Sequence, residues 1–557
     1  MLFDEIEKVI LQLNNSKRFY RINGGNGTWI YDSHSNNIFN LDPELIEKGI
    51  INEDWNIFLN NSLDTSLRFL SICQGIKNAE QDFVAPLPPN EKCTVMMNTS
   101  NRCNLNCTYC FRCKTDPSVN NVETIKKTLE FVMKDYRPDA KQFIISYSMT
   151  SESSLDLPIL KQVAEEYINF ENYQFAETDI EDSCFKEFYG RLEKDLKPCN
   201  LGEFPPEDKK EVIKYLNSLL GNRDLMDILN ITESMFNDRD KSEILKRQFL
   251  GKWRIYRLNR WGLEILYDRY IHKRRVPFVA FGFMTNGTCA SPEFIDFIKA
   301  CDVNPLWISI DGPKEVHNAN RKYNTGNGSY DDVIKNVKIF RKNGISLVAT
   351  AVVNANYPKP IGIINHLLEL GFHQIALTPV RPGCECSFNE TNVKDLLLGY
   401  DEVYNALENS ALKHDFRLFH LLKEDMSMLA FYSFFRKTKM IQRCEFNNQI
   451  AVNSKGEVYP CVYFTGNKDF CYGNIYDGVD KNKMQHDIYI NHRGKCNECW
   501  ARYLCGGTCL YASYKATGNH LAIDPIECTI KKHMAERCMK LIVFLYEHNI
   551  PLDKILN

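Results

Sequence analysis

Residues 103–111 of the chain read CNLNCTYCF, which places Cys103, Cys107 and Cys110 in a Cys-x3-Cys-x2-Cys pattern. Three thiolates can bind three irons of a cubane cluster and leave the fourth iron without a protein ligand. A further thiolate from the protein would block that open iron, so we expect Cys113 to be a bystander. The stretch therefore predicts an iron–sulfur site with one vacant coordination position.

A second group of cysteines lies towards the C-terminus. Cysteine makes up 21 of 557 residues, so the first triplet alone should arise about 0.03 times per chain by chance. The second group contains a Cys-x2-Cys-x5-Cys-x3-Cys run with further cysteines before and after it: Cys444, Cys461, Cys496, Cys499, Cys505, Cys509 and Cys528. A structural zinc site is the alternative interpretation of the four-cysteine run. Since zinc leaves the first triplet unexplained, we favour iron–sulfur clusters.

Together the two groups resemble the radical S-adenosylmethionine (SAM) enzymes with a SPASM domain. The resemblance implies that a 4Fe–4S cluster on the triplet binds SAM at its open iron and cleaves it to a 5'-deoxyadenosyl radical. It also implies two auxiliary 4Fe–4S clusters, one on Cys444, Cys461 and Cys509, the other on Cys496, Cys499, Cys505 and Cys528. The first set is one thiolate short. An open iron could bind a substrate thiolate there, or one further cysteine could complete the set: Cys384, Cys386 or Cys471.

Composition bounds the class of protein. The length of 557 residues predicts two or three domains, and 44% hydrophobic with 25% charged residues is typical of a soluble globular protein. A formal net charge of −3 gives no basic field that would attract nucleic acid or an anionic membrane. Neither a signal peptide nor a membrane-spanning run is evident. We therefore expect a cytoplasmic protein whose cysteines bind metal instead of forming disulfides.

Six short apolar runs predict the strands of an α/β fold: residues 94–98, 143–147, 279–284, 306–310, 347–353 and 374–378. Helical spacing is found between several of them, at residues 155–170, 330–343 and 361–370. Such alternation implies a parallel sheet with its chemistry at the carboxyl ends of the strands. Six strands match the partial (β/α)6 barrel of the radical SAM family.

The chain is predicted to have three parts: an N-terminal α+β module (residues 1–92), the partial barrel (93–383), and a SPASM domain with a C-terminal helix (384–557). In the first part, residues 20–32 predict a β-hairpin and residues 40–44 carry helix-start chemistry. The module resembles those that bind the leader segment of a precursor in peptide-modifying radical SAM enzymes, and a cap over the barrel is the alternative expectation.

The barrel is interrupted by a charged, helix-leaning insertion at about residues 171–275. A solvated surface insertion and a lid above the barrel are both open interpretations. We favour the first, because a run of charges is usually an exposed face.

The resemblance assigns SAM contacts to residues at the strand ends: Tyr109, Glu152, Ser309, Asp311, Arg321 and Asn354. The backbone of Tyr109 would contact the adenine. The family's Gly-Gly-Glu motif reads here as residues 150–152, Thr-Ser-Glu, so the carboxylate is kept and the glycines are replaced. Ser309 and Arg321 would contact the carboxylate and the ribose of SAM. Asn354 would contact the ribose.

Structural roles are open for some of these residues. Glu152 is alternatively a structural carboxylate, and Asp311 is equally a turn residue before Gly312-Pro313. We expect His317 to be a surface or turn histidine and not a ligand.

Sulfatase maturases of this family have a catalytic aspartate directly after the cysteine that follows the glycine, which here is Cys461 after Gly456. This chain has Val462, which cannot take up a proton. We therefore predict a peptide maturase that installs a thioether or carbon–carbon cross-link in a precursor peptide. Sulfatase-maturase-like oxidation, epimerisation and a zinc- or cluster-binding protein without turnover are the alternatives. A flavodoxin or ferredoxin is the expected one-electron reductant.

Overall fold

The computed structural model describes residues 18–25, 28–34, 36–41, 92–97, 100, 102–111, 121–137, 140, 142–147, 151–162, 278–300, 303, 305–442 and 444–556. Several features predicted from the sequence lie outside these residues. They are Cys113, Thr150, the insertion at about 171–275, and the predicted helix 155–170 beyond residue 162.

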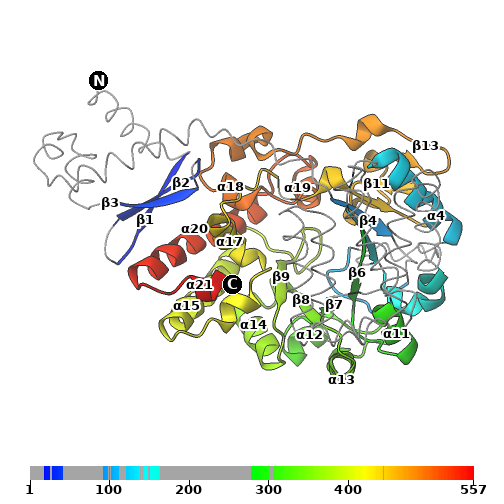
Figure 1. The fold of residues 1–557 in the computed structure, drawn as a ribbon, viewed down its shortest axis with the longest axis horizontal. Coiled ribbons are helices and arrows are strands. Elements are labelled where there is room, and N and C mark those ends of the chain that lie inside the picture. The colour runs from blue at the N-terminus through cyan, green and yellow to red at the C-terminus, as the bar shows by residue number, and fades with distance from the viewer. Residues whose placement is uncertain are drawn as a thin grey trace, which may run out of the picture.

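A central sheet runs through the molecule (Figure 1), and its described strands are ordered β13-β12-β11-β10-β4-β5-β6-β7-β8-β9. Six neighbours are parallel and follow chain order: β4 Lys92–Met97, β5 Gln142–Tyr147, β6 Phe278–Thr285, β7 Leu306–Ser309, β8 Leu347–Val353 and β9 Ile375–Pro379. All six predicted strands are therefore present, and the predicted α/β fold with a parallel sheet is confirmed.

The C-terminal part of the chain extends the same sheet. Strand β10 (Gln449–Val452) pairs in parallel with β4, although about 350 residues separate them in the sequence. Strands β11 (Glu457–Tyr459), β12 (Gly473–Asn474) and β13 (Gly478–Val479) continue it in antiparallel fashion. The cysteine-rich region is thus joined directly to β4, the first strand of the parallel sheet, next to the loop of the first cysteine triplet.

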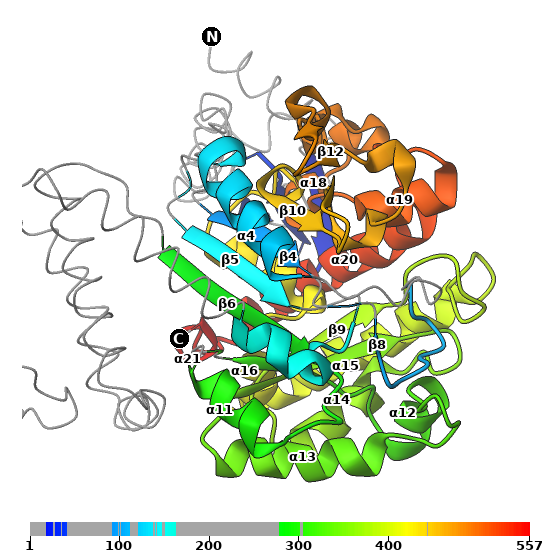
Figure 2. The ribbon, with the colours of Figure 1, turned by 90° about the vertical axis from the view of Figure 1, so that its right-hand side faces the viewer.

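Helices cover the sheet and the C-terminal region. Figure 2 shows α11, α13 and α14 along one side of β6–β9. The described α-helices are α4 Val122–Phe131, α11 Pro292–Ala300, α12 Lys314–Asn320, α13 Tyr330–Lys342, α14 Pro360–Glu369, α15 Val393–Leu412, α16 Arg417–Leu421, α17 Leu429–Phe435, α18 Arg502–Cys505, α19 Leu510–Thr517, α20 Pro525–Glu547 and α21 Asp553–Leu556. No helix in the described parts of the chain is long and apolar enough to span a membrane.

Helix α13 illustrates why these segments fold as they do. Its apolar residues Val333, Val337 and Phe340 recur with helical spacing and are all buried against the sheet. Asp331 and Asp332 lie in its first turn, where carboxylates interact favourably with the helix dipole. The predicted helices 330–343 and 361–370 correspond to α13 and α14.

The N-terminal part contains a three-stranded antiparallel sheet, β1 (Phe19–Asn23), β2 (Thr28–Asp32) and β3 (Asn37–Leu41). The predicted hairpin is confirmed. The third strand was not predicted. Residues 40–41 end it, and the other residues of the predicted helix start, 42–44, lie outside the described residues. Asn36 explains the strand: its φ of 53° is left-handed, which allows the tight turn that returns the chain along β2.

This N-terminal sheet packs on the C-terminal helices (Figure 1). Tyr20 stacks on Trp500 with ring centroids 3.8 Å apart, and the indole nitrogen of Trp29 donates to Glu547 at 3.0 Å. Asn36 donates to the carbonyl of Ser433 at 3.3 Å. The described strands therefore pack on the C-terminal helices through their aromatic face, while the role of residues 1–92 in leader recognition or as a cap stays a prediction.

Candidate functional site

The loop that carries the cysteine triplet lies at the carboxyl end of β4, where a parallel sheet places its chemistry. Its backbone is fixed to the segment that follows α12. The amide of Asn106 donates to the carbonyl of Lys322 at 2.7 Å, and the amide of Thr108 donates to that of Asn320 at 3.0 Å. Leu105 is almost fully buried beneath the loop. These contacts hold the loop against α12 and the segment that follows it.

The three thiols of this loop are electrostatic neighbours. Burial raises the pKa of Cys107 to about 11, with smaller contributions from Cys110 and Cys103, while the nearby guanidinium of Arg321 acts in the opposite direction. The side-chain amide of Asn286 donates to the sulfur of Cys103 at 3.8 Å. Clustered thiols served by an N–H donor and a cation have the donor chemistry that a thiolate-ligated cluster requires.

Glu152 connects the loop after β5 to the end of β6. Its buried carboxylate accepts from the hydroxyl of Thr285 at 2.7 Å, the amide of Asn286 at 2.6 Å and the hydroxyl of Ser154 at 2.5 Å. Burial raises its pKa, and these hydrogen bonds counteract the rise. The carboxylate thus has a structural role, while its contact with SAM stays a prediction.

Asp311 is the centre of a buried polar network at the end of β7. Its carboxylate accepts from the Nε of Arg321 at 3.1 Å, from the amide of Val352 at 3.1 Å, and from the hydroxyl of Tyr109. The guanidinium of Arg321 lies 5.5 Å from the Tyr109 ring centroid. The predicted residues Tyr109, Asp311 and Arg321 are therefore brought together beside the cysteine loop.

The structure corrects one expectation and refines another. His317 is fully buried within α12: its Nδ1 accepts from the amide of Asp311 at 3.3 Å and its Nε2 lies 3.0 Å from the hydroxyl of Ser329. The prediction of a surface or turn histidine is thus wrong, because the polar groups around the end of β7 need an internal partner. The Asp311 side chain belongs to the network, and Gly312, with a φ of 105°, makes the turn.

Ser309 and Asn354 are both buried at the carboxyl ends of β7 and β8. The side chain of Asn354 donates to Asn320 at 2.9 Å. Asn320 and Asn286 were missed by the sequence reasoning, although both contact the cysteine loop. Asn286 could have been found from the sequence, because it lies in the Thr-Asn-Gly stretch at the carboxyl end of β6. No sequence pattern pointed to Asn320.

The first C-terminal cysteine set lies in an aromatic environment. Cys444 and Cys461 pack against a cluster of buried residues: Phe446, Phe464, Phe470, Ile488 and Leu510. Burial raises the pKa of Cys461, and the neighbouring thiols of Cys509 and Cys444 raise it further. The three cysteines predicted to share one cluster are therefore close to one another.

The second set forms a separate neighbourhood. Burial raises the pKa of Cys496 to about 12, with further contributions from Cys505, Cys528 and Cys499. Burial likewise raises the pKa of Cys528 to about 11. After Cys505 the chain reverses through Gly506 and Gly507, whose φ values of 66° and 89° favour glycine. This turn directs Cys505 and Cys509 to different sets.

The three candidates for a fourth ligand of the first set lie in two places. The sulfurs of Cys384 and Cys386 lie 2.9 Å apart on the loop after β9, and the carbonyl of Cys386 accepts from Ala355 at 3.0 Å. Cys471 packs in the same hydrophobic cluster as Cys461. The packing therefore favours Cys471 over the other two candidates.

Among the residues that the structure describes, no group of three or more His, Cys, Asp or Glu side chains has the arrangement to hold one metal ion. A cubane binds its cysteines through different irons, so its ligands can lie farther apart than those of a single ion. The assignments of the cysteines to clusters stay predictions, supported by donor chemistry and by neighbourhood.

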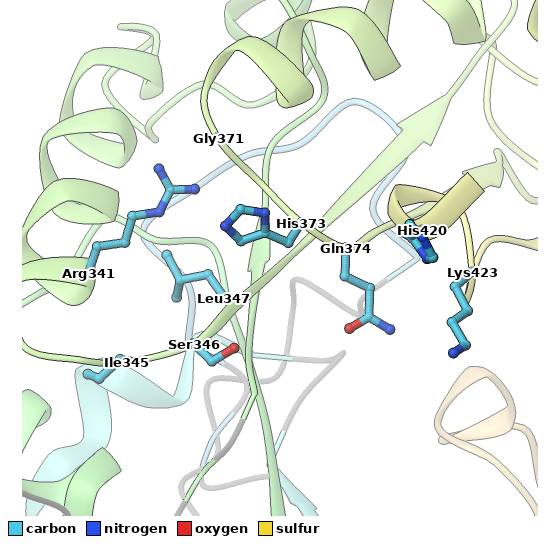
Figure 3. A pocket seen from close by; sticks show the side chains of 9 residues that line it. All are labelled: Arg341, Ile345, Ser346, Leu347, Gly371, His373, Gln374, His420 and Lys423. Atoms are coloured by element: carbon cyan, nitrogen blue, oxygen red, sulfur yellow. The ribbon is translucent and has the colours of Figure 1, made fainter. Parts of the chain in front are cut away.

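A cavity of about 370 Å³ (Figure 3) lies at the other end of the sheet. Leu347 at the start of β8 and Gln374 just before β9 line it, with the side chains of Arg341 and His373 on one side. Because the cysteine loop and the polar network lie at the carboxyl ends of the strands, this cavity is not part of the candidate site.

Comparison with known proteins is consistent with this geometry. No protein-family model matches the chain. It is 26% identical over 253 residues to a serine-type anaerobic sulfatase-maturating enzyme of Bacteroides thetaiotaomicron, covering 40% of this chain and 59% of that enzyme. It is 21% identical over 313 residues to the radical SAM cyclopropyl synthase TigE of Paramaledivibacter caminithermalis, covering 53% and 61%. The chain is related to radical SAM enzymes.

The chain spans about three fifths of the length of these two relatives, 59% and 61% respectively. It is also 24% identical over 256 residues to an AdoMet-dependent heme synthase of Methanosarcina barkeri, covering 43% of this chain and 72% of the synthase. Among solved structures, native anSMEcpe with bound AdoMet and Cp18Cys peptide has a TM-score of 0.50 at 16% identity, covering 83% of this chain and 100% of that one. The relatives confirm the resemblance to radical SAM enzymes, and the fold is shared with the anSMEcpe structure.

Proposed function

We propose that the protein is a radical SAM peptide maturase that abstracts hydrogen from a precursor peptide and installs a thioether or carbon–carbon cross-link. One observation carries the proposal: Cys103, Cys107 and Cys110 converge at the carboxyl ends of the parallel strands, beside the buried Asp311–Arg321 pair. A 4Fe–4S cluster bound there with SAM would supply the 5'-deoxyadenosyl radical. In this proposal the division into residues 1–92, 93–383 and 384–557 corresponds to peptide recognition, radical chemistry and auxiliary clusters.

The residues of this chain would hold and orient SAM. Asn320 and Asn286 hold the cysteine loop, and would thereby help to position a cluster bound to its thiols. Arg321, held by Asp311, presents a cation that would pair with the carboxylate of SAM. Ser309 and Asn354 would contact its ribose from the ends of β7 and β8.

A peptide substrate is supported by the relatives that modify proteins and by the solved structure that contains a peptide. Sulfatase-type oxidation is less well supported, because Val462 follows Cys461 and is buried, so no carboxylate is present at that position. Peptide epimerisation is an alternative within the same chemistry. A flavodoxin- or ferredoxin-type protein would deliver the reducing electron.

Formation of 5'-deoxyadenosine tests the radical chemistry. The protein is reconstituted anaerobically with iron and sulfide, reduced, and given SAM, and the nucleoside is quantified. We expect product from the wild type and none from Cys107→Ala. Cys538→Ser is the matched control, because Cys538 is a buried cysteine outside the motifs whose sulfur donates to the carbonyl of Ser427 at 3.1 Å, a bond that serine can keep. Equal product from Cys107→Ala and wild type would refute the triplet assignment.

Metal analysis and mass spectrometry separate the remaining alternatives. Zinc without iron or sulfide in the reconstituted protein would exclude the radical chemistry. A peptide encoded next to the gene should lose two hydrogens if a cross-link forms. No change in mass would instead indicate epimerisation.

A further inference from the structure

Arg381 lies two residues after the end of β9, between the barrel sheet and the C-terminal cysteine region. Its terminal nitrogen Nη1 donates to the carboxylate of Glu527 at 3.1 Å. Its Nε is buried and has no hydrogen-bond partner among the described residues. A buried N–H without an acceptor is destabilising, so this donor calls for an acceptor that the described residues do not supply.

Glu527 links this arginine to a predicted cluster ligand. One carboxylate oxygen accepts from Arg381, and the other accepts from the backbone amide of Cys509 at 2.8 Å. Lys531 pairs with the same carboxylate at 2.8 Å and donates to the carbonyl of Gly507 at 2.7 Å. Arg381 and the backbone of Cys509 are therefore held on the two oxygens of one buried carboxylate.

Arg381 brings a positive charge next to Cys509 through the Glu527 carboxylate that the two residues share. Lys531 is a second cation on this carboxylate, and the carboxyl group of Asp524 lies in the same electrostatic neighbourhood. A cluster on thiolates becomes more negative when it is reduced, so a neighbouring cation and N–H donors to its sulfurs favour the reduced form.

The first C-terminal cysteine set faces the loop of the cysteine triplet. Phe111 directly follows Cys110, and its ring centroid lies 4.1 Å from that of Tyr463. Tyr463 packs on Tyr511 at 5.0 Å. These two tyrosines lie two residues after Cys461 and Cys509, respectively. Of the two C-terminal cysteine sets, the first is therefore connected to the radical site by packed aromatic rings.

We infer that Arg381 is a positioning residue for the auxiliary cluster predicted on Cys444, Cys461 and Cys509, to which its free Nε–H donates, and that its charge raises the reduction potential of that cluster. The inference rests on the proposed function, because it requires that cluster to be present. A raised potential would make this cluster, which faces the triplet, a stronger electron acceptor than it would be without Arg381. An acceptor of this kind is needed when a substrate radical is oxidised during cross-linking.

The test is an anaerobic redox titration of the full-length reconstituted protein, followed by electron paramagnetic resonance. The signal lost in Cys461→Ala identifies the first auxiliary cluster. In Arg381→Gln we expect the ratio of reduced to oxidised cluster at a fixed potential to fall at least about tenfold. Arg381→Lys keeps the cation but has no Nε–H, and should give an intermediate shift. The signals of the other two clusters should not move.

Arg537→Gln is the matched control, since Arg537 on α20 is also an arginine paired with carboxylates, those of Asp401 and Glu408 on α15. Its removal should leave the first auxiliary cluster unchanged. The inference is overturned if Arg381→Gln titrates like the wild type or shifts all clusters equally. If Arg381→Gln does not assemble its clusters, the inference is overturned when the first auxiliary cluster of Arg381→Lys titrates like that of the wild type. If the wild type has no signal that Cys461→Ala removes, the cluster assignment of the proposed function fails instead.

Discussion

The side-chain amide of Asn354 donates to the side-chain oxygen of Asn320 at 2.9 Å, which joins the end of β8 to the end of α12. The hydroxyl of Thr108 approaches the same oxygen at 3.4 Å, and the amide of Thr108 donates to the carbonyl of Asn320 at 3.0 Å. Both asparagines are buried. One side chain thus links the cysteine loop to the residue predicted to contact the ribose of SAM.

Replacing Asn320 with alanine should weaken SAM binding about tenfold, because Asn354 and Thr108 lose their shared acceptor and each unsatisfied buried donor costs about 1–3 kcal/mol. Iron content should stay at the wild-type level, since the thiols are untouched. Isothermal titration of the reconstituted protein with SAM measures the effect. Asn343→Ala is the control, because Asn343 bonds to Ile339 and Lys299 at the end of α13. Unchanged SAM affinity in Asn320→Ala would contradict the linking role.

Asp311→Asn should loosen the site locally. The variant leaves the buried guanidinium of Arg321 without its anion, and breaking a buried pair costs about 3–5 kcal/mol. Hydrogen exchange of residues 105–110 and 309–323 should accelerate on the order of 100-fold, as measured by mass spectrometry. Asp331→Asn breaks the exposed pair with Lys314 and should change exchange by less than about fivefold. Equal acceleration of exchange in the two variants would show that the buried Asp311–Arg321 pair stabilises the site no more than the exposed pair does.

His317 should make stability depend on pH. Burial lowers its pKa from 6.5 to about 4. Between these values the unfolded chain binds a proton that the folded protein excludes, so stability falls as the pH is lowered from 6.5 to 4, by up to about 3 kcal/mol. His317→Asn keeps an acceptor near the amide of Asp311 and cannot titrate. Its thermal midpoint should therefore decrease less than that of the wild type over this range. Parallel curves for the two proteins would count against the pKa shift.

A sulfatase-type cysteine peptide should not be converted to formylglycine by this protein. The reason is Val462, which is buried where a carboxylate base would be needed. Peptide mass after anaerobic incubation with SAM and reductant gives the answer, and a sulfatase maturase serves as the positive control. Conversion of the thiol to an aldehyde would contradict this prediction and support sulfatase-type oxidation as the function.

Much of the fold was predictable from local patterns. Apolar runs such as residues 347–353 and periodic segments such as α13 specify parallel strands and amphipathic helices through neighbours a few residues apart. The pairing of β10 with β4 was not predictable, since β10 is a short apolar segment and its partner lies far away in the chain. The same holds for β3, whose strand conformation depends on its pairing with β2.

By itself, the sequence determined which atoms are available for chemistry: the spacing of the thiols, the carboxylate at Glu152 and the missing carboxylate at Val462. Tertiary structure alone decided which groups meet, such as His317 with Asp311 and Arg381 with Glu527. The physical reason is that ligand spacing is a property of the covalent chain, whereas the satisfaction of a buried polar group depends on segments that folding brings together from distant positions.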